Sequence, residues 1–181
     1  MKLRHAKRID FTGEIADFDH FDSFDQKVID LIRGEKRSDV VIIIDRGFGF
    51  AGGHIRPHII VDHINLTGDN PLVGPNNPIG QRFPVVNDIY ISAADTMDQE
   101  ETWAMGHPMG KLRNGIAAGV KSGLKLSDEE LATVHTLGAG LYCYNLVPAM
   151  IVAAHAGLKV LGLVVPEGSK LERETLMAIS R

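Results

Sequence analysis

Apolar runs of strand length recur along the chain and alternate with segments of helical periodicity. The clearest run is residues 39–45, where five β-branched residues stand between two aspartates. Because this run is apolar on both faces, it predicts a central strand that is covered from both sides. Further strands are predicted at residues 57–64, 114–120, 141–146 and 159–165, with a short one at 88–91.

Helical spacing predicts an opening helix before the first strand. Phe18, Phe21 and Phe24 recur every third residue, which favours the buried stripe of a helix. That helix is predicted to continue to Arg33 and to end at Gly34, because glycine commonly follows the last helical turn.

Later helices begin at recognisable residues. Ser127, with Glu130 three residues later, forms the capping box that opens a helix reaching Leu137. Pro148 opens an Ala-rich helix that runs through His155. Helices are also predicted at residues 93–105 and from residue 171 onward.

This alternation of strands and helices predicts the α/β class, with a three-layer α/β/α architecture and a largely parallel central sheet. The length of 181 residues suits one domain. We therefore expect residues 1–181 to form a single α/β domain, in which residues 1–38 are a divergent N-terminal arm and helix.

Composition narrows the class of protein. The chain is 44% hydrophobic and 23% charged, with a formal net charge of −4. Without a basic surplus, this balance argues against a nucleic-acid partner. We find no apolar run of about 18 residues and no leader-like apolar segment, so we expect no membrane partner. The single cysteine, Cys143, excludes an internal disulfide and favours a reducing, cytoplasmic location, and we interpret it as core filler.

Three histidines raise the question of a metal site. Strand alternation would place His54 and His58 on one face and His63 on the other, which works against a shared ion. The aspartates of residues 17–25 lack the spacing of a calcium loop. The glycine-rich residues 46–53 match neither a P-loop nor a dinucleotide-binding fingerprint. We therefore predict no metal and no organic cofactor.

Residues 62–84 form a long segment rich in Asn, Gly and Pro, the residues that build turns. An irregular segment of this length in a compact chain is typical of a functional or interfacial loop. It contains DHINL, NPLVGPN and GQRFP. These motifs resemble the trimeric branch of the purine nucleoside phosphorylase family, within the nucleoside phosphorylase superfamily.

Two further segments support this resemblance. Residues 137–158 contain Leu-Gly-Ala, Val-Pro and His-Ala-Gly-Leu in the family's order, and residues 39–44 are followed by a similar Ala-Gly-Gly turn. The resemblance covers roughly residues 38–168 and is that of a shortened, divergent member.

The resemblance implies phosphorolysis of a purine nucleoside. Inorganic phosphate, the co-substrate, attacks the anomeric carbon while negative charge builds on the departing purine. The family holds phosphate with a glycine-rich loop carrying a serine and with an Arg–His pair, and we find neither here. We also expect the family's carboxyl-terminal ribose-contacting histidine to be absent. The family's purine-binding Phe–Glu pair falls on Lys125 and Leu126, and a leucine cannot hydrogen-bond a purine edge.

Other family positions keep side chains that suit a nucleoside site. The Met–Ser pair of the ribose-binding strand corresponds to Tyr144 and Asn145, which we predict to bind substrate. The residue that protonates the leaving purine falls near Glu167, the predicted catalytic acid. Phe83 matches the aromatic that the family sends into a neighbouring subunit's site, and it also suits a plain interface residue.

The sequence therefore predicts two alternative functions. One is nucleoside or base binding with weak, altered or absent cleavage of the glycosidic bond, including a hydrolytic variant in which water replaces phosphate. The other is a catalytically inactive family member that acts as a structural or regulatory oligomeric partner. In both cases we expect a homo-oligomer, and the resemblance implies a trimer. The sequence alone leaves the ligand, and the question of whether the chain is an enzyme, open.

Overall fold

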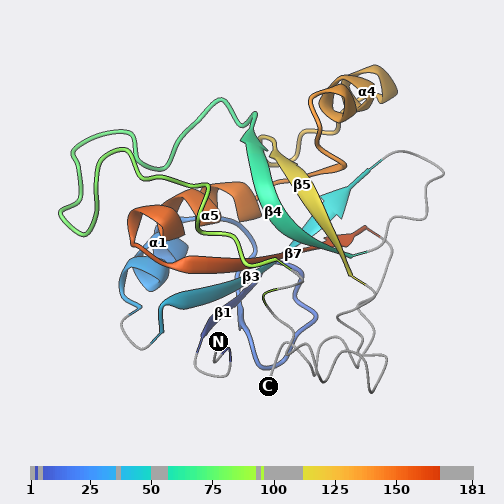
Figure 1. Ribbon diagram of the computed structural model, residues 1–181. Helices are drawn as coiled ribbons and strands as arrows, with labels where there is room; N and C mark the ends of the chain where they lie inside the picture. The colour runs from blue at the N-terminus through green and yellow to red at the C-terminus, as the bar shows by residue number, and fades with distance from the viewer. Residues whose placement is uncertain are drawn as a thin grey trace.

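The computed structural model describes residues 3, 6–35, 38–49, 57–92, 95 and 112–167. Within them, seven strands form one sheet in the order β2-β1-β3-β6-β5-β4-β7 (Figure 1). Since β3 also pairs with β7, the strands from β3 to β7 close into a ring, and the core is barrel-like. The strands are β1 Lys7–Asp10, β2 Asp19–His20, β3 Val40–Phe48, β4 His58–Asn65, β5 Arg113–Gly119, β6 Leu141–Cys143 and β7 Lys159–Pro166.

The sheet is mixed. β3 runs parallel to β1 and β7, while β5 runs parallel to β4 and β6. The two groups meet in antiparallel fashion, where β3 meets β6 and where β4 meets β7. Parallel pairing therefore holds inside each group, and the two antiparallel seams join the groups into the ring.

The central strand β3 confirms the prediction from its β-branched run. Val41 and Ile43 are fully buried in the hydrophobic cluster that includes the helices. Ile42 and Ile44 are fully buried in a second cluster. Because successive side chains of a strand point to opposite faces, β3 contributes to the core on both sides.

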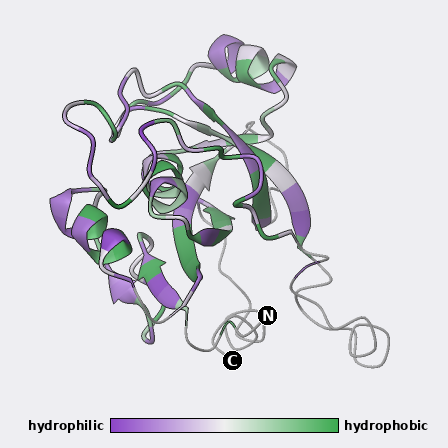
Figure 2. Cartoon of the chain, turned by 60° about the vertical axis from the view of Figure 1, so that its left-hand side comes forward, coloured by the Kyte–Doolittle hydropathy of each residue, from purple (hydrophilic) through white to green (hydrophobic). Residues whose placement is uncertain are grey.

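Two helices cover one face of the sheet, and they pack against each other (Figure 1). They are α1 Gln26–Arg33 and α5 Leu146–His155. A third helix, α4 Asp128–Thr136, lies apart from them and begins with the predicted capping box of Ser127 and Glu130 (Figure 1). Figure 2 shows that hydrophobic residues concentrate in the central strands.

The α/β class is confirmed by this arrangement of helices against a sheet. Ile15 and Phe18, from the loop after β1, contribute to the second cluster. The helices predicted at residues 93–105 and from residue 171 lie outside the described residues, apart from residue 95. A complete three-layer arrangement therefore stays a prediction.

The opening helix is shorter than its phenylalanine spacing predicted. Phe18 and Phe21 flank β2, which pairs with β1 and fixes this segment as strand and turn. α1 begins only after Asp25, whose carboxylate accepts two backbone N–H groups of the first turn. The phenylalanines are buried separately: Phe18 in the second cluster, Phe21 and Phe24 against the first.

Two other element boundaries differ from the predictions. β6 ends at Cys143 and α5 begins at Leu146, so the predicted strand is shorter and the helix begins before Pro148. The strand predicted at residues 88–91 is reduced to a single bridge between Tyr90 and Val160. In the described part of the chain, no helix is long and apolar enough to cross a membrane.

Candidate functional site

Two strand ends and one turn converge at one edge of the sheet. Gly47, near the end of β3, pairs with Cys143 at the end of β6. The carbonyl of Gly47 also accepts the backbone N–H of Glu167, which follows β7, at 2.8 Å. The fold therefore brings Glu167 close to the β6–α5 turn that carries Tyr144 and Asn145. We call this region the strand-end site.

Tyr144 belongs to a group of three aromatic rings. Its ring centroid lies 5.2 Å from that of Phe48 and 6.1 Å from that of Tyr142, and the last two rings stack at 5.1 Å. The Tyr144 hydroxyl donates a hydrogen bond to the carbonyl of Leu124 at 2.8 Å. This bond ties the β6–α5 turn to the loop before α4.

Two carboxyl groups, Glu167 and Asp45, act on the Tyr144 hydroxyl. Burial raises the pKa of Tyr144, Tyr142 raises it further, and the negative charges of Glu167 and Asp45 add to the rise. Tyr144 therefore stays a neutral hydroxyl near pH 7. Glu167 is exposed, so its carboxyl can reach a ligand from solvent. Together these groups can hydrogen-bond an uncharged polar molecule and offer it a proton donor.

Asp45 is a fully buried carboxylate at this site, with 1% of its surface exposed. Its Oδ2 accepts the backbone N–H of Asn145 at 2.7 Å and that of Leu146 at 2.9 Å. Its Oδ1 accepts the backbone N–H of Arg46 at 2.9 Å and the Asn145 side-chain amide at 3.2 Å. Burial raises the pKa of the Asp45 carboxyl, and these four donors oppose the rise. The sequence marked Asp45 only as the polar end of an apolar run.

Asn145 has both ends of its side-chain amide engaged inside the protein. Its Nδ2 donates to Asp45, and its Oδ1 accepts the backbone N–H of Phe24 at 2.9 Å. The residue is 8% exposed. It therefore fixes the turn that presents Tyr144, and it links that turn to the segment before α1.

Lys125 and Leu126, where the resemblance implies the family's purine-binding pair, lie in the loop before α4. Leu126 is partly buried and packs against the cluster that contains Leu131 and Val134 of α4. The neighbouring Lys125 is exposed. This loop contributes packing for α4 at the place where the resemblance implies a hydrogen-bonding glutamate.

The long irregular segment of residues 66–89, which we call the strap, leaves the end of β4 and returns past α5 (Figure 1). Asn76 Oδ1 lies 3.3 Å from His155 Nε2 in the last turn of α5. A Cβ atom at Gly80 would lie 1.8 Å from the carbonyl oxygen of His155, so the strap backbone rests directly on that turn. Beyond the strap, the Tyr90 hydroxyl and His63 Nδ1 form a hydrogen bond.

The strap exposes apolar side chains to solvent. Phe83 is 83% exposed, Val73 80% and Val85 69%. The guanidinium of Arg82 lies 5.9 Å from the centre of the Phe83 ring. The strap therefore presents these three apolar side chains to solvent.

The histidines do not form a metal site in the described part of the chain. His54 lies outside it, while His58 and His63 both lie on β4. Across the described ranges, no group of three or more His, Cys, Asp or Glu side chains could hold a metal ion. Cys143 is fully buried, and burial raises the pKa of its thiol well above the usual value, which suits a core side chain.

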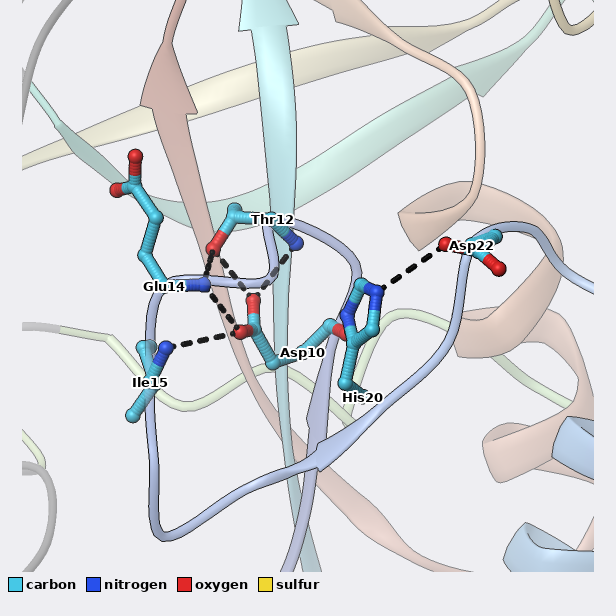
Figure 3. A network of polar contacts seen from close by, with 6 residues as sticks. All are labelled: Asp10, Thr12, Glu14, Ile15, His20 and Asp22. Carbon is cyan, nitrogen blue, oxygen red and sulfur yellow. Dashed lines mark hydrogen bonds and ion pairs between the residues drawn. The ribbon is translucent and has the colours of Figure 1, made fainter.

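A second buried carboxylate, Asp10, ends β1 beside β3 (Figure 3). It accepts the backbone N–H and the hydroxyl of Thr12 at 2.7 and 2.6 Å, and the backbone N–H groups of Glu14 and Ile15 at 3.0 and 3.1 Å. These donors all come from the loop that follows it. Asp10 therefore shapes its own loop, whereas Asp45 reaches across the fold to α5.

Comparison of the sequence with known proteins gives partial matches to purine nucleoside phosphorylases. The chain is 34% identical over 106 residues to purine nucleoside phosphorylase 1 of Bacillus subtilis (strain 168), covering 58% of this chain and 38% of that protein. It is 33% identical over 134 residues to the purine nucleoside phosphorylase of Mus musculus, covering 67% and 45%. The chain thus spans less than half the length of these curated relatives. No family model matches it.

Comparison with solved structures gives the same fold. Schistosoma purine nucleoside phosphorylase in complex with hypoxanthine aligns with a TM-score of 0.59 and 22% identity, over 78% of this chain and 56% of that one. Isoform 2 from Schistosoma mansoni, in complex with cytosine and ribose-1-phosphate, aligns with a TM-score of 0.56 and 23% identity, over 78% and 55%. The sequence matches and the shared fold together show that this chain is related to the purine nucleoside phosphorylase family.

Proposed function

We propose that the chain binds a purine nucleoside or purine base at the strand-end site, with weak, altered or absent cleavage of the glycosidic bond. The curated relatives are named as purine nucleoside phosphorylases, and one related structure contains hypoxanthine. The observation that carries the proposal is the pairing of Gly47 with both Cys143 and Glu167, which brings the exposed Glu167 close to Tyr144 at one edge of the sheet.

Each residue of the site has a proposed role. The half-buried ring of Tyr144 contacts the base or ribose. Asn145, predicted as a second substrate-binding residue, has both ends of its amide engaged inside the protein, and we propose instead that it holds the turn in place through Asp45. Glu167 is the catalytic acid: it gives its proton to the purine nitrogen as the bond from that nitrogen to the anomeric carbon breaks. Phosphate or water supplies the oxygen that bonds to that carbon. Phosphate is the co-substrate if cleavage is phosphorolytic, and we propose no other cofactor.

We propose further that the chain acts as a homo-oligomer, with a trimer as the form suggested by resemblance. Phe83 would then enter the nucleoside site of a neighbouring subunit. Its 83% exposure supports this role, because Val73 and Val85 of the same segment are also exposed and apolar surface that gathers in a patch commonly marks an interaction site. A single α/β domain over residues 1–181, with helices on both faces of the sheet, and a cytoplasmic location belong to the same proposal. The one buried cysteine supports that location.

A second function, that of a structural or regulatory partner without catalysis, is favoured by the strap. This segment exposes Val73, Phe83 and Val85, while the place corresponding to the purine-binding glutamate holds Leu126. Under this function the oligomer forms through the strap, and the strand-end site binds no nucleoside.

Thermal melting with purine nucleosides, free purines and ribose 1-phosphate, with and without phosphate, separates the two functions. A ligand at 100 times its dissociation constant should raise the melting temperature by about 5–11 °C. Glu167→Gln should keep this shift while abolishing cleavage, and Tyr144→Phe should weaken it. Glu129→Gln, at an exposed position of α4, is the matched control and should change neither the ligand-induced melting shift nor cleavage. A melt that no saturating ligand moves would refute nucleoside binding and favour the structural role.

A further inference from the structure

The amino end of α5 is stabilised by an anion from elsewhere in the chain. The first turn of α5 contains no acidic residue, and the Asn145 side chain makes no capping hydrogen bond. Instead, the buried Asp45 carboxylate accepts the backbone N–H groups of Asn145 and Leu146, about 100 positions away in sequence. These N–H groups have no partner within the helix, and the helix dipole makes them attractive to negative charge.

The hydrogen-bond pattern fits an ionised Asp45. All four of its contacts are N–H donors, two from the start of α5, one from the Asn145 amide and one from Arg46. A protonated carboxyl would direct an O–H toward this set of donors, where it would find no acceptor. The side chain of Arg46 is itself ion-paired with Glu14 on the neighbouring loop.

We propose that Asp45 is a specificity-determining residue: its carboxylate occupies the anion position at the amino end of α5, so that the strand-end site takes an uncharged nucleoside or base and excludes inorganic phosphate. This inference rests on the proposed function and defines its substrate class. Free phosphate at the same helix end would have to lie beside a buried like charge. At about 4 Å, that repulsion lowers affinity on the order of a thousandfold.

Besides Asp45, the strand-end site contains a second acidic group. Glu167 is a second carboxyl close enough to Tyr144 to raise the pKa of that phenol, together with Asp45. An uncharged ligand meets the Tyr144 ring and these acceptors without electrostatic penalty. Glycosidic cleavage at this site would therefore use water: its oxygen bonds to the anomeric carbon as the carbon–nitrogen bond breaks, and the Glu167 carboxylate takes the proton that water loses and gives it to the departing purine.

The first test titrates the intact protein with inorganic phosphate at constant ionic strength and follows the backbone amide signals of Asn145 and Leu146 by NMR. We expect no saturable shift up to 10 mM phosphate, and an inosine affinity that changes less than twofold when phosphate is present. A saturable shift of these two amides, or inosine binding that tightens tenfold with phosphate, would overturn the proposal.

The second test compares two isosteric variants. Asp45→Asn removes the buried charge and should gain phosphate binding at least tenfold at the α5 amides. Asp10→Asn is the matched control, because Asp10 is equally buried and held by a similar set of donors but faces no helix end (Figure 3). It should lose stability without gaining phosphate binding.

The outcomes separate this inference from the proposed function. If inosine binds neither with nor without phosphate, the proposed function fails, while the phosphate titrations of the wild type and of Asp45→Asn, with Asp10→Asn as control, still decide the role of Asp45. If Asp45→Asn does not fold, the wild-type titration remains decisive. A folded Asp45→Asn variant that still excludes phosphate would refute the inference.

Discussion

Replacing Gly80 by alanine tests whether the strap is seated on α5. The added Cβ would lie 1.8 Å from the carbonyl oxygen of His155 and 2.9 Å from its carbonyl carbon. Both atoms belong to the helix backbone and cannot rotate away. The strap must therefore lift off the last turn of α5 until an ordinary separation near 3.4 Å is restored, a movement of about 1.6 Å.

The loss in free energy of unfolding caused by Gly80→Ala follows from this displacement. Forcing an extra methyl into a packed contact costs about 1–3 kcal/mol. Lifting the strap also breaks the 3.3 Å contact between Asn76 Oδ1 and His155 Nε2, which adds about 1 kcal/mol. The total of about 2–4 kcal/mol should lower the melting temperature of a chain this size by about 4–16 °C.

Gly140→Ala is the control for this experiment. A Cβ there meets nothing within 4 Å, and this glycine does not have a positive φ. Its melting temperature should stay within about 2 °C of the wild type. Thermal melting and the NMR signals of the His155 ring measure the effect. If Gly80→Ala melts like the control and leaves the His155 ring signals unmoved, the strap does not rest on α5.

Three further predictions concern the same elements. Burial, and then the positive charge of Arg33, lower the pKa of His155 below 6.5, so the folded state binds this proton less tightly than the unfolded chain. The contribution of His155 to the free energy of unfolding should therefore be fully present above about pH 6.5 and fall as the pH drops below that value. Urea midpoints measured against pH should show this decline, and His155→Gln should flatten it. Ser127→Ala should cost about 1 kcal/mol and speed hydrogen exchange in the first turn of α4, because the capping hydroxyl is lost; unchanged exchange would refute the cap. Phe83→Ser should leave the urea midpoint of a dilute sample unchanged and lower the mass measured by light scattering at high concentration, whereas an unchanged mass would contradict a role at the interface.

Several elements could be predicted because their signals are local. The β-branched run of β3 is apolar on both faces, and such a run is typical of a strand buried on both sides. The capping box of α4 places its two partners three residues apart, so the sequence alone positions them. The turn-rich composition of residues 62–84 likewise predicted an irregular segment, which the strap confirms from residue 66 onward, whereas residues 62–65 belong to β4.

The boundaries that were wrong depend on partners far away in sequence. The spacing of Phe18, Phe21 and Phe24 suits a helix, but pairing between β2 and β1 overrides it. α5 begins at Leu146 rather than Pro148 because the Asp45 carboxylate caps it from β3. Neither β1 nor Asp45 lies within the few residues around the boundary that it sets.

The candidate site also combines features that the sequence determined with features that only the fold determined. The sequence by itself determined which chemical groups are present, including Tyr144, Glu167 and the leucine at position 126, and it indicated the family through the motifs of residues 62–84 and 137–158. Only the tertiary structure decided how these groups are used. It buried Asp45 against the start of α5, engaged both ends of Asn145 and left Phe83 in solvent. The physical reason is that side-chain identity is carried by each position alone, whereas burial and hydrogen-bond partners arise when the sheet closes and brings residues about 100 positions apart into contact.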